Sequence, residues 1–220
     1  MKQIPARPAA SDDGAKRAKA REHEWQRLRS KLGRRYAECT FDSFVPFTEV
    51  GVGELQEAAR LKLREYVADM RGNVKAGRNV VLYGPPGTGK DHLLTSMLRD
   101  AIAADVSCDW VNGMSLFERR RDAIDTDIRE KDILAEYVKP AVLAISDPVP
   151  PWGDLQQGQA EFLFRLIDQR YRQLKPVWVT ANVASGKDAE KRIGTQVIDR
   201  LRDGGIAIEF KWPSHRKVAT

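Results

Sequence analysis

The residues best suited to chemistry form a glycine-rich stretch, Gly84-Pro85-Pro86-Gly87-Thr88-Gly89-Lys90-Asp91. An apolar run, 80–83, precedes it, and a helix-like run, 92–98, follows it. Glycines let successive backbone N–H groups turn toward phosphate oxygens at positions where a Cβ would clash. Lys90 can reach the β- and γ-phosphates as a positive charge, and the N-terminus of the next helix favours anions. The stretch therefore predicts a phosphate-binding loop, or P-loop, for a nucleotide.

The last position of this loop departs from the usual pattern. The pattern G-x-x-x-x-G-K is complete, but Asp91 stands where a Ser or Thr normally contacts Mg²⁺. A carboxylate at this position can ligate magnesium directly or through water, although it adds negative charge beside the phosphates. We therefore expect the loop to bind a nucleotide and treat hydrolysis as a separate question.

A second feature expected of a nucleotide hydrolase is an acid at the end of another buried strand, where it holds Mg²⁺ and orients water. The apolar segment 141–146 is followed by Asp147, which we expect to bind magnesium. The alternative is that an Asp before a proline starts a turn. The next apolar segment, 177–181, is followed by Asn182, a polar side chain able to position the attacking water near the γ-phosphate.

The periodicity of apolar residues predicts an α/β fold. The predicted strands are 79–83, 108–112, 141–146, 176–181 and 206–210. The predicted helices are 15–32, 54–70, 91–104, 115–138, 159–174, 187–193 and 195–203. Strands that alternate with helices indicate a mainly parallel sheet covered by helices on both faces.

The positive charge of the chain lies at its N-terminal end. The net charge is +6, yet residues 1–36 hold 11 Lys and Arg against 4 Asp and Glu, and the rest holds 26 against 27. Such an arm suits nucleic acid or an acidic protein surface, with a solvated tail as the alternative. Residues 1–14 read as disordered. The stripe Trp25, Leu28 and Leu32 is too thin to fold alone, so we expect it to need a partner surface.

Several classes of protein do not suit this composition. No apolar run approaches the length of a membrane span, and the first ten residues lack the apolar core of a secretory signal. Cys39 and Cys108 are isolated, which indicates neither a disulfide framework nor a zinc site. We therefore expect a cytoplasmic protein without a membrane partner.

The ordered set of motifs over residues 34–220 resembles the AAA+ family of bacterial replicative-helicase loaders (DnaC-like) and their transposition-helper relatives (IstB-like). The motifs that carry the resemblance are Arg35-Tyr36, Thr40-Phe41-Asp42-Ser43-Phe44, the loop 84–91 with His92-Leu93, Asp147, Asp168-Gln169-Arg170-Tyr171, Thr180-Ala181-Asn182, Ile198-Asp199-Arg200-Leu201 and Ser214-His215-Arg216. On the basis of this resemblance, we expect three parts: a basic, partly disordered and helical arm (1–33), a linker and helix on the core (34–75) and an AAA+ ATP-binding domain (76–220).

The resemblance implies an ASCE-type P-loop NTPase sheet in which the acidic strand lies beside the P-loop strand. It also implies assembly of the chain with itself into a ring or spiral, with ATP and Mg²⁺ at subunit interfaces. Asn182 would be the sensor-1 residue, Arg200 an arginine finger acting on the neighbouring subunit's ATP, and Arg216 the sensor-2 arginine. His92 would join the loop in binding ATP, and the segment before the loop would lie against the adenine.

The partners implied by the resemblance are a replicative helicase and single-stranded DNA. Helices near 115–138 would face that DNA, which makes Arg119, Arg120 and Arg121 candidate phosphate contacts; a solvated charged helix face is the alternative. The family's acidic strand usually ends in two acids, whereas this chain has Ser146-Asp147. Three functions stay open: a helicase loader with weak ATP hydrolysis, a non-hydrolysing ATP-dependent adaptor, and an IstB-like transposition helper.

Overall fold

Five short apolar runs become the strands of one parallel sheet in the computed structural model, which describes residues 10–124, 126, 128–151 and 153–216. The strands are β1 (Val80–Tyr83), β2 (Cys108–Asn112), β3 (Val142–Ser146), β4 (Val177–Ala181) and β5 (Ile206–Glu209). Their order across the sheet is β2-β3-β4-β1-β5, and each neighbouring pair is parallel. All carboxyl ends therefore meet at one edge of the sheet.

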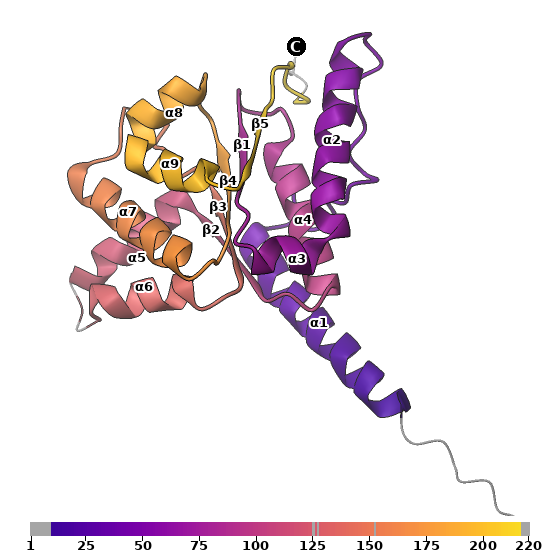
Figure 1. Ribbon diagram of the computed structural model, residues 1–220, viewed down its shortest axis with the longest axis horizontal. Helices are drawn as coiled ribbons and strands as arrows, with labels where there is room; N and C mark the ends of the chain where they lie inside the picture. Colours follow the sequence, from indigo (N-terminus) through magenta and orange to yellow (C-terminus); the bar gives the residue numbers. More distant parts are fainter. Residues whose placement is uncertain (1–9, 125, 127, 152, 217–220) are drawn as a thin grey trace, which may run out of the picture.

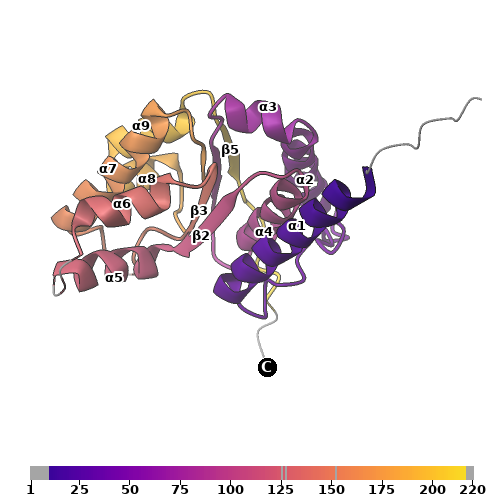
Figure 2. The ribbon, with the colours of Figure 1, turned by 90° about the horizontal axis from the view of Figure 1, so that it is seen from below.

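Alternation along the strands divides the apolar residues between two cores. In β1, for example, Val80 and Leu82 face one core and Val81 the other. One face of the sheet is covered by α1 (Ala10–Leu32), α2 (Val52–Ala68), α3 (Met70–Lys75) and α4 (Lys90–Ala103) (Figures 1 and 2). The other face is covered by α5 (Gly113–Ile124), α6 (Glu130–Val138), α7 (Gln157–Arg172), α8 (Gly186–Ile193) and α9 (Thr195–Arg202). Within the described ranges, no helix combines the length and the apolar character needed to cross a membrane.

The strand order corrects one expectation. The acidic strand β3 does not lie beside the P-loop strand β1, because β4 lies between them and pairs with both. Thr180 of β4 is level with Leu82 of β1 on one side and with Ser146 of β3 on the other. The polar residues that end β4 therefore stand between the glycine loop and Asp147.

The predicted helix 115–138 is in fact two helices, α5 and α6. Near the end of α5, the hydroxyl of Thr126 donates to the carbonyl oxygen of Asp122 at 3.1 Å. The backbone N–H of Thr126 donates to the carbonyl oxygen of Ala123 at 3.3 Å. Side chains that bond nearby backbone compete with helix continuation. The second helix then starts with Glu130 and Asp132 in its first turn, where carboxylates favour a new N-terminus.

The basic arm is more ordered than the sequence predicts over residues 10–14, since α1 starts at Ala10; residues 1–9 lie outside the described chain. Its second half packs on the core, where Leu28 is 0% and Leu32 6% exposed. Arg27 and Lys31 both bond the carboxylate of Asp109 in β2, at 3.1 and 2.7 Å. The surface that this helix needs is thus supplied by the chain's own α4 and β2.

Candidate functional site

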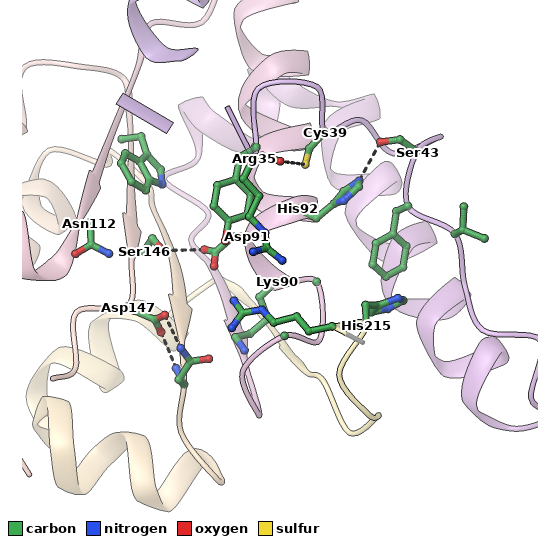
Figure 3. A pocket seen from close by; sticks show the side chains of 18 residues that line it. Arg35, Cys39, Ser43, Lys90, Asp91, His92, Asn112, Ser146, Asp147 and His215 are labelled. Carbon is green, nitrogen blue, oxygen red and sulfur yellow. Dashed lines mark hydrogen bonds between the residues drawn. The ribbon is translucent and has the colours of Figure 1, made fainter. Parts of the chain in front are cut away.

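A cavity of about 450 Å³ lies at the carboxyl edge of the sheet, where ligands commonly bind in open α/β folds. Predicted site residues that line it are Gly87, Gly89, Lys90, Asp91, His92, Asp147, Asn182 and Arg216. Lining residues that the sequence did not single out for this role are Arg35, Tyr36, Cys39, Trp110 and Asn112. Figure 3 shows this convergence of the loop, the strand ends and the segment that contains Arg35 and Ser43.

Two glycines of the loop leave no room for a side chain, because other segments of the chain pack against them. Gly84 has φ +140°, and a Cβ there would lie 2.5 Å from the carbonyl oxygen of Phe210. Gly89 has φ +94°, and a Cβ there would lie 2.6 Å from a ring carbon of Phe44. The indole N–H of Trp212 also donates to the carbonyl oxygen of Thr88 at 2.8 Å. The C-terminal segment and the linker therefore hold the loop in shape.

Lys90 is folded into the loop that it belongs to. Its ammonium donates to the carbonyl oxygens of Gly84 at 2.9 Å and Pro85 at 2.7 Å, and the residue is 4% exposed. Burial lowers the pKa of this amine, while the negative charges of Asp147 and Asp91 favour its charged form. The loop thus carries a positive charge at its centre, where phosphate oxygens can replace the backbone carbonyls as its partners.

Asp91 connects the start of α4 to the ends of two strands. Its Oδ1 accepts hydrogen bonds from the hydroxyls of Ser146 and Thr180, both at 2.8 Å. With Asp147 nearby, the available donors are carboxylate and hydroxyl oxygens, the ligand type that Mg²⁺ prefers. In the described part of the chain no group of three His, Cys, Asp or Glu could hold a metal alone. The donor set fits magnesium held jointly by a few protein oxygens and by phosphates.

Asp147 is held in an uncommon backbone conformation by its neighbour on β4. Its φ is +48°, in the left-handed region that non-glycine residues seldom adopt. Its carboxylate accepts hydrogen bonds from the backbone N–H of Asn182 at 2.8 Å and from the side-chain amide of the same residue. The pKa of Asp147 is raised to about 6, first by burial and then by the negative charge of Asp91, while the positive charge of Lys90 acts in the opposite direction.

The wall opposite the strands is aromatic. The ring of His215 stacks on Phe47, with 4.3 Å between centroids, and lies 5.4 Å from the centroid of Phe44. Gln56, fully buried, bonds the Nε2 of His215 at 3.0 Å and accepts from the backbone N–H of Phe47 at 2.6 Å. The backbone N–H of His215 donates to Gly87 at 2.9 Å. Nothing in the sequence marked Gln56 as the residue that anchors this linker to His215.

Arg200 lies outside the cavity. Its Nε and Nη2 bond one carboxylate oxygen of Asp168 at 2.9 and 2.8 Å, and its guanidinium lies 4.8 Å from the centroid of the Phe164 ring. The pair is largely shielded, with 23% and 13% of the two side chains exposed. Action on a neighbouring subunit's nucleotide stays a prediction, and it requires this ion pair to open.

The arginine cluster of α5 also lies outside the cavity. Arg119 pairs with Glu136 of α6 at 3.6 Å, and Arg120 with Glu130 at 2.9 Å. Both pairs tie α5 to α6. Arg121 is exposed, and the described residues offer it no ion pair. Contact with DNA stays a prediction for all three, with Arg121 the most accessible.

Replacing Asp147 by asparagine should stabilise the nucleotide-free protein. The raised pKa means that the carboxyl group favours the folded state when protonated; this contribution is full below about pH 4 and is lost as the pH rises through about 6. At pH 7.5 the ionised group is therefore a cost. We expect Asp147→Asn to raise the free energy of unfolding by about 1–2 kcal/mol, because solvent partly screens the charge that the substitution removes.

Urea unfolding at pH 7.5 and pH 4, followed by circular dichroism, measures this effect. The gain should shrink toward zero at the lower pH. Asp122→Asn, a change of an exposed acid on α5, serves as the matched control. A destabilised Asp147→Asn variant at pH 7.5 would contradict the account of the buried charge.

Comparisons with known proteins agree with this geometry. Residues 54–218, well over half of the chain, match the family model described as IstB-like ATP binding protein. An ATP-binding protein of insertion sequence IS5376 from Geobacillus stearothermophilus is 32% identical over 142 residues, or 63% of this chain and 55% of that protein. An AAA ATPase forming ring-shaped complexes, from Bifidobacterium longum subsp. infantis, is 25% identical over 134 residues, or 59% of this chain and 22% of that protein. The chain thus spans about half or less of these curated relatives.

Solved structures share the fold. The crystal structure of the DnaC helicase loader aligns with a TM-score of 0.70 at 22% identity, covering 81% of this chain and 100% of that one. The crystal structure of DnaI aligns with a TM-score of 0.63 at 20% identity, covering 84% of this chain and 94% of that one. The structure of DnaA bound to AMPPCP and single-stranded DNA aligns with a TM-score of 0.64 at 15% identity, covering 83% of this chain and 51% of that one. The P-loop, the parallel sheet and the matched family together place the chain among the AAA+ proteins, in the family of IstB-like ATP binding proteins.

Proposed function

We propose that this protein is an ATP-dependent AAA+ helper that assembles with itself on single-stranded DNA and delivers a partner protein to that DNA. The observation that carries the proposal is the cavity at the carboxyl edge of the sheet, in which Lys90, Asp91, Asp147 and Asn182 converge. The resemblance to helicase loaders and transposition helpers implies that a bound nucleotide controls assembly. The cavity offers a charge for the phosphates, oxygens for a metal and a positioned acid.

Each residue has a distinct task in this proposal. The backbone N–H groups of the loop 84–90 and the ammonium of Lys90 bind the phosphates. Oxygens of Asp91, Ser146 or Asp147 would hold magnesium, which would supply positive charge against the phosphates. Asp147, fixed by Asn182, orients the attacking water by accepting a hydrogen bond from it. Arg216 lies at the same cavity and adds positive charge toward the phosphates.

Two partners remain candidates, and they rest on different observations. A transposase-linked role is supported by a relative from an insertion sequence at 32% identity. A replicative helicase as partner is supported by the DnaC and DnaI structures, whose identities of 22% and 20% speak for the fold alone. The sequence relationship therefore favours the transposition helper. The exposed residues 13–20 of α1, several of them basic, are the docking surface that we propose for DNA or for the partner.

ATP-dependent retention on DNA tests this proposal. Fluorescently labelled single-stranded DNA, titrated with the full chain, should give a clearly larger anisotropy increase with ATP and Mg²⁺ than without nucleotide, and Lys90→Ala should abolish the difference. Adding a replicative helicase or a transposase should then show which one joins the complex. Equal DNA binding with and without ATP, in the wild type, would contradict the proposal.

A further inference from the structure

We propose that the carboxylate and the hydroxyl of the magnesium site have exchanged positions in this chain. Asp91, at the start of α4, supplies the carboxylate, and Ser146, at the end of β3, supplies the hydroxyl. Asp147 is then not the metal acid but the acid that faces water. The inference rests on the proposed nucleotide site and names the metal ligands within it.

The usual arrangement sets the reference. In P-loop NTPases, Mg²⁺ is held by a Ser or Thr at the end of the loop and by an Asp at the end of the acidic strand. Here the loop position is Asp91 and the strand position is Ser146. Taken alone, each difference from the usual pattern removes a standard magnesium ligand. Taken together, the two differences leave one carboxylate and one hydroxyl at these positions, with the same total charge as in the usual pattern.

The two side chains meet as the exchange requires. The hydroxyl of Ser146 donates to Oδ1 of Asp91 at 2.8 Å, and Figure 3 shows the two side chains pointing toward each other. The hydroxyl of Thr180 donates to the same oxygen at 2.8 Å. These bonds fix the orientation of the carboxylate. The other oxygen, Oδ2, receives no hydrogen bond from the described residues, and Asp91 lines the cavity, so this oxygen is available to a cation.

Asp147 is engaged elsewhere. Both of its carboxylate oxygens accept hydrogen bonds from Asn182, one from the backbone N–H and one from the side-chain amide. The left-handed backbone at φ +48° turns it toward the end of β4. It is the residue that follows the metal position on the strand, as a water-orienting acid would be. The exchange therefore explains how a single acid after β3 leaves the site with both a metal carboxylate and a second acid.

The Mg²⁺ dependence of nucleotide affinity tests the exchange without relying on turnover. A fluorescent ATP analogue is titrated into the full-length wild type, Asp91→Thr, Ser146→Asp, the double variant with both changes, and Asp147→Asn. Each titration is done in Mg²⁺ and in EDTA. For each variant, the dissociation constant in EDTA is divided by the dissociation constant in Mg²⁺, and these ratios are compared. Thermal unfolding without nucleotide checks that each variant is folded, and Mn²⁺ binding in the presence of nucleotide, followed by electron paramagnetic resonance, gives a second readout.

Opposite effects are expected for the two single changes. Asp91→Thr leaves a hydroxyl at both exchanged positions and a carboxylate at neither, so the ratio should fall about tenfold or more, toward unity. Ser146→Asp places two carboxylates face to face, which should weaken binding in EDTA and increase the ratio. The double variant restores one of each and should return the ratio to within about threefold of the wild type, which is the signature of coupled neighbours. Asp147→Asn should leave the ratio unchanged.

Two outcomes would overturn the exchange. One is an unchanged ratio in Asp91→Thr together with a ratio near unity in Asp147→Asn. That result would make Asp147 the acid that binds the metal and Asp91 a purely structural link between α4 and the strands. The other is a double variant no better than Asp91→Thr alone. A wild type that binds no nucleotide under either condition would instead remove the proposed site itself, so the two failures are distinguishable.

Discussion

Replacing Lys90 by alanine is expected to weaken ATP binding by about 2–5 kcal/mol, or roughly 30-fold to more than 1000-fold. Lys90 is 4% exposed, and its ammonium lies inside the glycine loop, where it donates to the carbonyl oxygens of Gly84 and Pro85. Without it, the phosphates would enter a cavity that also holds the charges of Asp91 and Asp147. Isothermal titration calorimetry with ATP in Mg²⁺ measures the change.

The control for this variant is Lys187→Ala, which removes an exposed lysine at the start of α8 that does not line the cavity. It should bind ATP as the wild type does. Lys90→Ala also loses hydrogen bonds to two loop carbonyls, so its thermal unfolding must be recorded beside the titration. A folded Lys90→Ala variant with wild-type affinity would remove the loop from the nucleotide site.

Replacing Asp147 by asparagine is expected to reduce steady-state phosphate release by about 10²- to 10⁴-fold while nucleotide binding is retained. Asparagine keeps the size of the side chain and can still bond Asn182, yet it cannot accept a proton from water as a carboxylate does. The same variant is expected to be more stable than the wild type. Loss of turnover with a gain in stability is the pattern of a residue kept for chemistry at the expense of stability.

This measurement also separates an ATPase from an adaptor that binds ATP without turnover. Phosphate release by the wild type, with and without single-stranded DNA, is compared with that of Asp147→Asn and of Asp122→Asn. DNA-stimulated release that disappears only in Asp147→Asn supports hydrolysis at this site. No release above background in the wild type, under either condition, would favour the adaptor.

Much of the fold could be predicted because apolar periodicity is a local property. The predicted strand 108–112 matches β2, the predicted helix 91–104 is shifted by one residue from α4, and the predicted helix 195–203 ends one residue after α9. The break between α5 and α6 was missed because charged residues continue through it without a glycine or proline. The position of β4 between β1 and β3 was missed because strand order is set by packing between distant segments rather than by local pattern.

The site was predictable to the extent that its residues follow strands. Asp147 and Asn182 meet at one edge because parallel strands end together. The fully buried Arg170, which donates to carbonyl oxygens near the starts of β3 and β4, looks from sequence like any helix-surface arginine. The contact between Asp91 and Ser146 joins residues 55 positions apart. Only the folded arrangement places the two residues in contact, and the proposed exchange rests on this contact.

The most direct test of the central claim is a crystal structure of the full chain with a non-hydrolysable ATP analogue and Mn²⁺. The account predicts phosphates along the loop 84–90, with the ammonium of Lys90 on them. The base should lie near the aromatic side chains of Phe44 and His215, which line the cavity. The anomalous peak of manganese should lie beside the carboxylate of Asp91. An empty cavity at saturating nucleotide, or a nucleotide bound elsewhere on the chain, would contradict the account.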